Sequence, residues 1–171
     1  EQILVQQFTW IGAPHIWNGD EVGMWGADDP DERKPMVWGD VRYDDERADV
    51  LGRPRPANRV EPDTALFGMY QRLIALRKAH ARLFADGERT WLVTDDAKGL
   101  LAYARLLGTE QAVVAFNRAD RPQAISVQAE GRYHQIYPAG ESVSAVDGRL
   151  SATLAPRTAR VWLRGIGMTR C

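Results

Sequence analysis

The sequence predicts two parts, an α/β segment followed by an all-β domain, because the spacing of apolar residues changes once along the chain. Before about residue 86 the apolar residues fit a helix, a short strand and a long amphipathic helix. From Gly87 onward they alternate in short runs separated by Asp, Gly, Asn and Pro, which is typical of an antiparallel sandwich. We therefore predict an α/β part over residues 1–86 and a β-sandwich domain over residues 87–171.

The α/β part begins with a predicted helix and strand. The helix is indicated by apolar residues that fit its last turns: Ile3, Leu4, Val5, Phe8 and Trp10. A Gly-Pro turn then precedes a short apolar strand, His15–Trp17. A loop of about forty residues, Val22 to Glu61, follows, and loops of that length are usually functional or disordered. Its aromatic residues Trp25, Trp38 and Tyr43 favour a functional loop.

A strong helix is predicted over residues 64–84, with Asp63 or Thr64 as its N-cap. Its apolar face is formed by Leu66, Met69, Tyr70, Leu73, Ile74 and Leu76. Basic residues fill its C-terminal turns, where the helix dipole favours positive charge: Arg77, Lys78 and Arg82.

The all-β part is predicted from seven short apolar runs. In chain order they are TWLVT, GLLAYARLL, QAVVAFN, AISVQA, YHQIY, RLSATLA and ARVWLRG. Trp91 and Trp162 lie within these runs, so both are expected in the core of the sandwich.

Composition narrows the functional classes. A net charge of −1 gives no electrostatic basis for binding nucleic acid or an anionic membrane surface. No run approaches the roughly 20 apolar residues of a membrane span. The single cysteine, Cys171, allows no intrachain disulfide, and the three histidines show no metal-binding spacing, so we expect no cofactor and no metal.

The chain starts at Glu1 without a signal sequence, and we expect it to be a piece of a longer protein. The sequence specifies neither the localisation nor the oligomeric state of that protein.

The acidic loop carries the candidate binding residues Trp25, Asp29 and Arg33. An indole ring covers the C–H face of a polyhydroxylated ligand, while a carboxylate and a guanidinium bind its hydroxyls. Two alternatives stay open: Asp29 and Arg33 form only a surface ion pair, worth under about 1 kcal/mol, and Trp25 or Trp38 fills a core.

Other acidic residues of this region are expected to be structural. Asp20 and Glu21 are adjacent on the predicted strand, so they point to opposite sides and cannot both reach one sugar ring. We expect them to pair with Lys or Arg. Asp28, Asp31 and Glu32 lack the spacing of a calcium loop, so we expect solvated loop charges.

Four stretches resemble the alpha-amylase superfamily, glycoside hydrolase family thirteen. GAPHIWNGDEVGM resembles the GxPxIYYGDEIGM segment at the eighth barrel strand, apart from Trp17-Asn18 in place of Tyr-Tyr, and GADDPDERKPMVW resembles the following loop in cyclomaltodextrinases and neopullulanases. LIALRKAHARL is similar to the helix that closes the barrel, and LAPRTARVWL to the last strand of the C-terminal sandwich. The resemblance spans nearly the whole chain in the right order.

This resemblance implies the terminal βα part of a TIM (β/α)8 barrel followed by a C-terminal antiparallel β-sandwich. It also implies a retaining glycoside hydrolase that acts on maltooligosaccharides, cyclodextrins or related α-glucans through three acidic residues. Those acids belong to motifs that this chain lacks, so we expect no catalytic residue here and an inactive isolated chain. Asp29 and Arg33 match residues that bind a glucose on the non-reducing side of the cleaved bond. The alternatives are a non-catalytic carbohydrate-binding module and a structural sandwich.

Overall fold

The structure, a computed structural model, describes residues 1–26 and 29–165 of the 171-residue chain. These residues form two compact units. The larger unit consists of Glu1–Pro14 together with the chain from Leu73 onward, and the smaller unit consists of His15–Arg72. This division describes packing, and the domain boundary expected between residues 86 and 87 stays a prediction.

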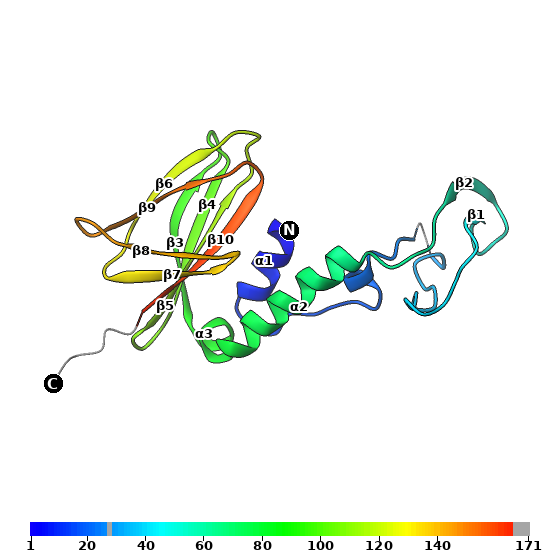
Figure 1. The fold of residues 1–171 in the computed structure, drawn as a ribbon, viewed down its shortest axis with the longest axis horizontal. Coiled ribbons are helices and arrows are strands. Elements are labelled where there is room, and N and C mark those ends of the chain that lie inside the picture. Colours follow the sequence, from blue (N-terminus) through cyan, green and yellow to red (C-terminus); the bar gives the residue numbers. More distant parts are fainter. Residues whose placement is uncertain (27–28, 166–171) are drawn as a thin grey trace. The chain divides into compact units, whose positions relative to one another are not determined.

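The larger unit is a β-sandwich, as the sequence predicts (Figure 1). A six-stranded sheet has the order β3-β4-β5-β10-β7-β8, and a second sheet pairs β6 with β9. The strands are β3 Glu88–Asp95, β4 Leu100–Leu107, β5 Glu110–Asn117, β6 Gln123–Gln128, β7 Arg132–Tyr137, β8 Ala139–Ser144, β9 Arg149–Leu154 and β10 Thr158–Arg164. Each predicted run lies in one of these strands. Strand β8 was not predicted, because its sequence AGESVS is mostly small and polar.

One face of the large sheet packs against β6 and β9. The cluster there includes Leu100, Val113, Ile125, Tyr133, Leu150, Leu154 and Trp162. Trp162 is 1% exposed, which confirms its predicted core position. Trp91 is 44% exposed, so its predicted core position is wrong. It lies on the edge strand β3 and contacts Trp10 and Tyr103, at ring-centroid distances of 5.9 and 5.8 Å.

Helices α1 (Gln2–Thr9) and α3 (Ala81–Asp86) pack against the same large sheet, and Figure 1 shows α1 on the side away from β6 and β9. Val5 and Phe8 of α1 are buried, as predicted, whereas Ile3 is 81% exposed. Leu83 and Phe84 of α3 are fully buried. Strands β4 and β5 are therefore covered on both faces, which explains their continuous runs LLAYA and AVVAF.

Two buried arginines hold the end of α1. Arg77 donates to the carbonyl oxygen of Phe8 (3.1 Å) in the last turn of the helix and to those of Trp10 (2.7 Å) and Gly12 just after it. Arg105 donates to the carbonyl oxygens of Thr9 (2.9 Å) and Gly87 (2.6 Å). The carbonyls at a helix C-terminus lack partners within the helix and carry partial negative charge, so guanidinium groups suit them.

Helix α2 (Thr64–Ala79) begins as predicted. The Asp63 carboxylate accepts a 2.9 Å hydrogen bond from the Leu66 amide, so Asp63 is the N-cap. The predicted continuation to residue 84 is wrong, because His80 has non-helical angles (φ −127°, ψ 39°) and separates α2 from α3. No Gly or Pro stands at this break, so the sequence carries no local signal for it.

The smaller unit contains a 3₁₀ helix, η1 (Asp20–Val22), and an antiparallel hairpin of β1 (Glu46–Ala48) and β2 (Pro54–Asn58). The hairpin divides the region that was predicted to be one long loop. The predicted strand at His15–Trp17 is absent. A strand needs a hydrogen-bonded neighbour, and every strand pair among the described residues is antiparallel and excludes this segment. The barrel therefore stays a prediction.

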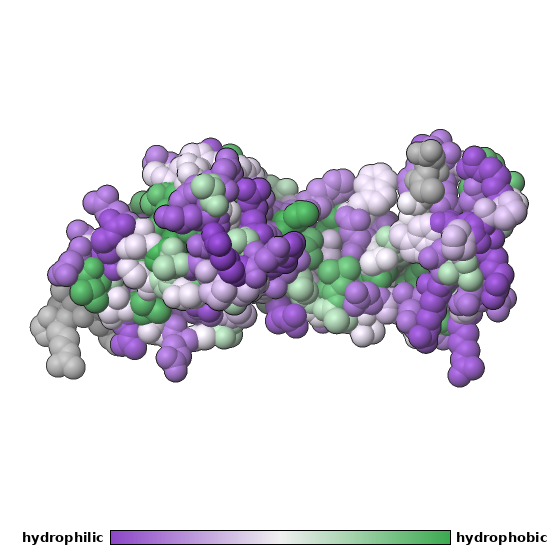
Figure 2. Space-filling model, turned by 90° about the horizontal axis from the view of Figure 1, so that it is seen from above, coloured by the Kyte–Doolittle hydropathy of each residue, from purple (hydrophilic) through white to green (hydrophobic). Residues whose placement is uncertain are grey.

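The described surface is largely polar. On the visible face of the 15–72 unit, at the right of Figure 2, hydrophilic residues predominate. Among the described helices, none is long and apolar enough to cross a membrane.

Candidate functional site

The candidate site lies in the acidic loop, which we define as residues 25–34 of the smaller unit. Asp29 and Arg33 form an ion pair in which Arg33 Nε lies 2.8 Å from Asp29 Oδ1. The Arg33 amide also donates to the Pro30 carbonyl (3.0 Å), so a turn brings the two side chains together. The side chains are 65% and 72% exposed, respectively. Both are thus held at the surface, where their remaining hydrogen-bonding atoms are open to a ligand.

Asp31 is a buried residue of the acidic loop that fixes the loop through ion pairs. It is 1% exposed, so the expected solvated charge at this position is wrong. Its carboxylate lies 3.2 Å from Arg55 Nη1 and 3.6 Å from Lys34 Nζ, and Glu46 meets the same cations at 3.6 and 2.8 Å. A buried carboxylate is tolerated only when it is paired, and here two cations and a second acid complete a compact network. Arg55 and Glu46 come from β2 and β1, so the hairpin braces the loop.

Two cations of this network, Arg55 and Lys34, cover part of the Trp25 ring. The guanidinium carbon of Arg55 lies 3.4 Å from the centroid of the indole ring, and Lys34 Nζ lies 4.2 Å from it. The residue remains 37% exposed. Arg55 thus fixes the ring by a cation–π contact, which leaves only part of the indole for a ligand.

Gly26 brings two parts of the loop into close contact. A Cβ atom at Gly26 would lie 2.6 Å from Glu32 Cα and 2.9 Å from the Asp31 carbonyl oxygen, so any side chain would push the backbone apart. The Asp29–Arg33 turn therefore depends on a glycine here. Asp28, which was expected to be a solvated charge, lies outside the described residues.

Trp38 is not in a core. It is 60% exposed, and its backbone amide donates to the Tyr43 hydroxyl at 2.8 Å. The sequence did not decide whether Trp25 and Trp38 stack on a ligand or fill a core. Of the two, Trp38 is the more exposed.

Asp20 and Glu21 are structural, but their partners differ from those predicted. Asp20 accepts a hydrogen bond from the Trp17 amide (3.1 Å), and Glu21 accepts one from the Gly19 amide (3.0 Å). Within the described chain neither carboxylate forms an ion pair with Lys or Arg. Burial raises the pKa of nearby Tyr70, and the two carboxylates raise it further. The pair therefore shapes the turn before the loop and makes its surroundings negative.

The described residues contain no group of three or more His, Cys, Asp or Glu side chains that could hold a metal ion. The acidic loop offers hydrogen bonding by the exposed charged groups of Asp29 and Arg33, with the partly free ring of Trp25 in the same loop. This combination suits a neutral, hydroxyl-rich ligand.

Sequence reasoning identified Asp29, Arg33 and Trp25 as candidates, and the structure places all three in this unit. The sequence did not identify Lys34, Glu46 and Arg55 as the residues that hold the loop. The last two are 12 and 21 positions beyond Lys34, and no local pattern links them. Only the alternation of acidic and basic residues between residues 28 and 55 offered a signal, and it did not specify the pairing.

Comparison with known proteins reveals sequence relatives that include neopullulanases and cyclomaltodextrinases. No family model matches the chain. It is 31% identical to neopullulanase 2 of Thermoactinomyces vulgaris over 153 residues, which are 88% of this chain and 23% of that protein. It is also 31% identical to a cyclomaltodextrinase of Geobacillus thermopakistaniensis over 152 residues, which are 88% of this chain and 22% of the relative. The chain thus spans less than a quarter of the length of these relatives.

The fold has similar counterparts among solved structures. An alpha-amylase from Geobacillus thermoleovorans, solved in complex with acarbose, aligns with a TM-score of 0.72 and 20% identity over 96% of this chain and 32% of that one. At this identity the match shows the fold alone. Together with the sequence relatives, it confirms the predicted resemblance: the chain is similar to part of the neopullulanases and cyclomaltodextrinases and shares its fold with part of an alpha-amylase.

Proposed function

We propose that this chain is part of a retaining glycoside hydrolase that cleaves α-glucosidic bonds of maltooligosaccharides, cyclodextrins or related α-glucans. The relatives named neopullulanase and cyclomaltodextrinase support this reaction class. In this proposal residues 1–86 belong to the end of a (β/α)8 barrel, and residues 87–171 form the C-terminal sandwich. The nucleophile, the acid/base and the third acid are supplied by a preceding segment, so the isolated chain hydrolyses nothing.

The role of this chain is to bind a glucose unit of the substrate through the acidic loop. The observation that carries the proposal is the Asp29–Arg33 pair, held at 2.8 Å with both side chains mostly exposed. Paired in this way, the carboxylate accepts from one sugar hydroxyl while the guanidinium donates to its neighbour. The buried Asp31 network keeps the pair in place, so little ordering entropy is lost when a sugar binds.

Substitution of Arg33 by alanine in the full-length enzyme tests this role. A hydrogen bond to a charged group contributes about 1.5–3 kcal/mol, so kcat/KM for long maltooligosaccharides should fall roughly ten- to hundredfold. The loss should shrink for substrates too short to reach this glucose site. The Asp29→Ala variant should behave alike, and the double variant should lose less than the sum if both residues bind one glucose.

The matched control is Arg53→Ala. Arg53 and Asp49 form the same kind of pair, with the same spacing of four residues and an N–O distance of 2.5 Å, in the turn between β1 and β2. Arg53→Ala should leave kcat/KM unchanged. Equal losses on short and long substrates, or a melting temperature that Arg33→Ala lowers by several degrees, would instead identify the Asp29–Arg33 pair as a brace of the loop.

A further inference from the structure

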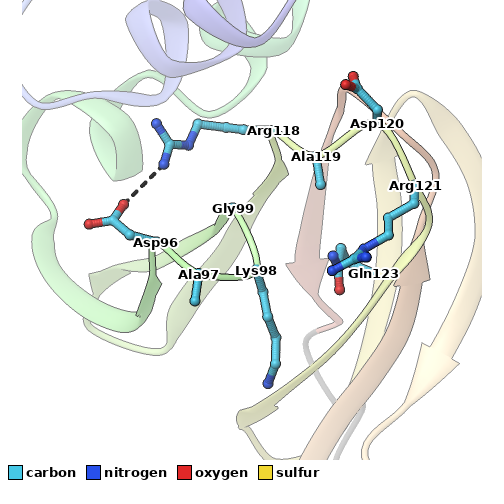
Figure 3. Close-up of a pocket in the computed structure, with 9 residues that line it drawn as sticks. All are labelled: Asp96, Ala97, Lys98, Gly99, Arg118, Ala119, Asp120, Arg121 and Gln123. Atoms are coloured by element: carbon cyan, nitrogen blue, oxygen red, sulfur yellow. Dashed lines mark hydrogen bonds and ion pairs between the residues drawn. The ribbon is translucent and has the colours of Figure 1, made fainter.

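A polar pocket lies at one end of the sandwich, within the larger unit. Its cavity of about 540 Å³ opens between the turn that joins β3 to β4 and the loop that joins β5 to β6 (Figure 3). Its described lining is Asp96–Gly99, Arg118–Arg121 and Gln123. These residues include three cations and no aromatic ring. The pocket therefore lacks the stacking surface that favours a sugar ring and presents charged donors instead.

Backbone and side-chain hydrogen bonds fix both walls of this pocket. The Arg118 amide donates to the Gly99 carbonyl at 2.8 Å, which ties the turn to the loop. Asn117 is fully buried, and its Nδ2 donates to the carbonyl oxygens of Arg121 and Ala155, both at 2.9 Å. The loop that carries Arg121 is thus held in place without a ligand.

The charges around the pocket leave one cation without an acid. Lys98 lies 3.4 Å from Asp95, Arg118 lies 3.0 Å from Asp96, and Arg157 lies 2.5 Å from Asp120. These acids are therefore each matched by one base. In the part of the chain that the structure describes, the exposed Arg121 has no acidic partner.

Gln123 supplies a second donor without an acceptor. Its side chain is 9% exposed, and its amide nitrogen makes no hydrogen bond within the described residues. Arg121 and Gln123 both line the pocket, as labelled in Figure 3. A buried donor that lacks an acceptor is unfavourable, so a turn of the Gln123 side chain toward an acceptor in the pocket would be stabilising.

We propose that this pocket binds an oxyanion, the phosphate or carboxylate group of a small ligand, with Arg121 as its main contact. The planar guanidinium presents paired N–H donors that match two oxygens of such a group. Lys98 and Arg118 at the rim add positive potential, and Gln123 adds a neutral donor. The site is independent of the acidic loop and of the proposed hydrolase function.

Titration of the intact chain with inorganic phosphate and, separately, with acetate tests the proposal. Amide NMR shifts are followed at constant ionic strength, with chloride as the balancing anion. At least one of the two anions should give saturable shifts at Gly99, Ala119 and Arg121, and the anion that binds more tightly identifies the ligand group. Arg121→Gln should weaken that binding at least about tenfold, since a charge-assisted hydrogen bond is lost. Arg121 is exposed, so the substitution leaves the fold intact.

Arg132→Gln is the matched control, because Arg132 is an exposed arginine of the same unit outside the pocket. It removes the same charge and should leave the affinity unchanged within about twofold. The absence of saturable shifts with both anions at about 10 mM would overturn the proposal. Equal weakening by Arg121→Gln and Arg132→Gln would also overturn it, because the anion would then respond only to the overall charge.

Discussion

Replacing Arg105 by methionine tests how strongly the two buried arginines stabilise the larger unit. Arg105 is fully buried, and its guanidinium bonds the carbonyl oxygens of Thr9 and Gly87 at 2.9 and 2.6 Å. Methionine fills most of the aliphatic volume but leaves both carbonyls without a donor. Two hydrogen bonds to a charged group contribute roughly 3–6 kcal/mol, and relief of the desolvation of the guanidinium offsets part of this.

We therefore expect the free energy of unfolding to fall by about 3 kcal/mol, measured by urea denaturation followed by circular dichroism. The melting temperature should fall by roughly 6–12 °C, since 1 kcal/mol corresponds to about 2–4 °C in a chain of this size. Arg132→Met is the control, because Arg132 is exposed, and it should change the free energy of unfolding by less than about 0.5 kcal/mol.

The partner substitution Arg77→Met adds a test of coupling. Burial lowers the pKa of Arg105, and the positive charges of Arg77 and Arg89 lower it further, so the arginines repel each other. Removal of Arg77 relieves part of this repulsion. Each single variant gains this relief, whereas the double variant gains it only once, so the double variant should lose more stability than the sum of the single variants. A loss below about 1 kcal/mol for Arg105→Met would refute the reasoning, since it would show that water or backbone movement satisfies the carbonyls.

Three further predictions follow from the two units. Hydrogen exchange should be fast over residues 15–72, which have fewer buried apolar residues, and slow in the sandwich strands; uniformly slow exchange would contradict this. Gly26→Ala should change the amide NMR shifts of residues 29–33, whereas Gly68→Ala, whose Cβ would meet only the Arg72 side chain at 3.4 Å, should not. Burial lowers the pKa of His80 despite the opposing charge of Glu110, so just below the ordinary histidine pKa of about 6.5 the unfolded chain binds more protons than the folded one. Stability should therefore fall as the pH drops through about 6.5, and His80→Gln should flatten that slope in urea denaturation; an unchanged slope would contradict the assignment.

Local patterns in the sequence were sufficient for most of the fold. Period-two alternation located seven of the eight sandwich strands, and helical spacing located α1 and the start of α2. The Asp63 N-cap was one of two candidates from the sequence, and it and the Asp29–Arg33 pair depend on short spacings, because their partners are three and four residues apart. Interactions over one turn of the chain are encoded in adjacent residues, and so they can be read before the fold is known.

Tertiary structure alone decided the features whose partners are distant in sequence. Asp31 is buried because Arg55, 24 residues later, neutralises it, and the same guanidinium covers the Trp25 ring. Arg105 is buried because its carbonyl partner on Thr9 lies 96 residues earlier. The strand expected at His15–Trp17 is missing because no described strand pairs with it. From the sequence alone, a charged loop residue is expected to be solvated and an apolar run is expected to form a strand. Only the fold determines which distant groups lie beside them, and so whether either expectation holds.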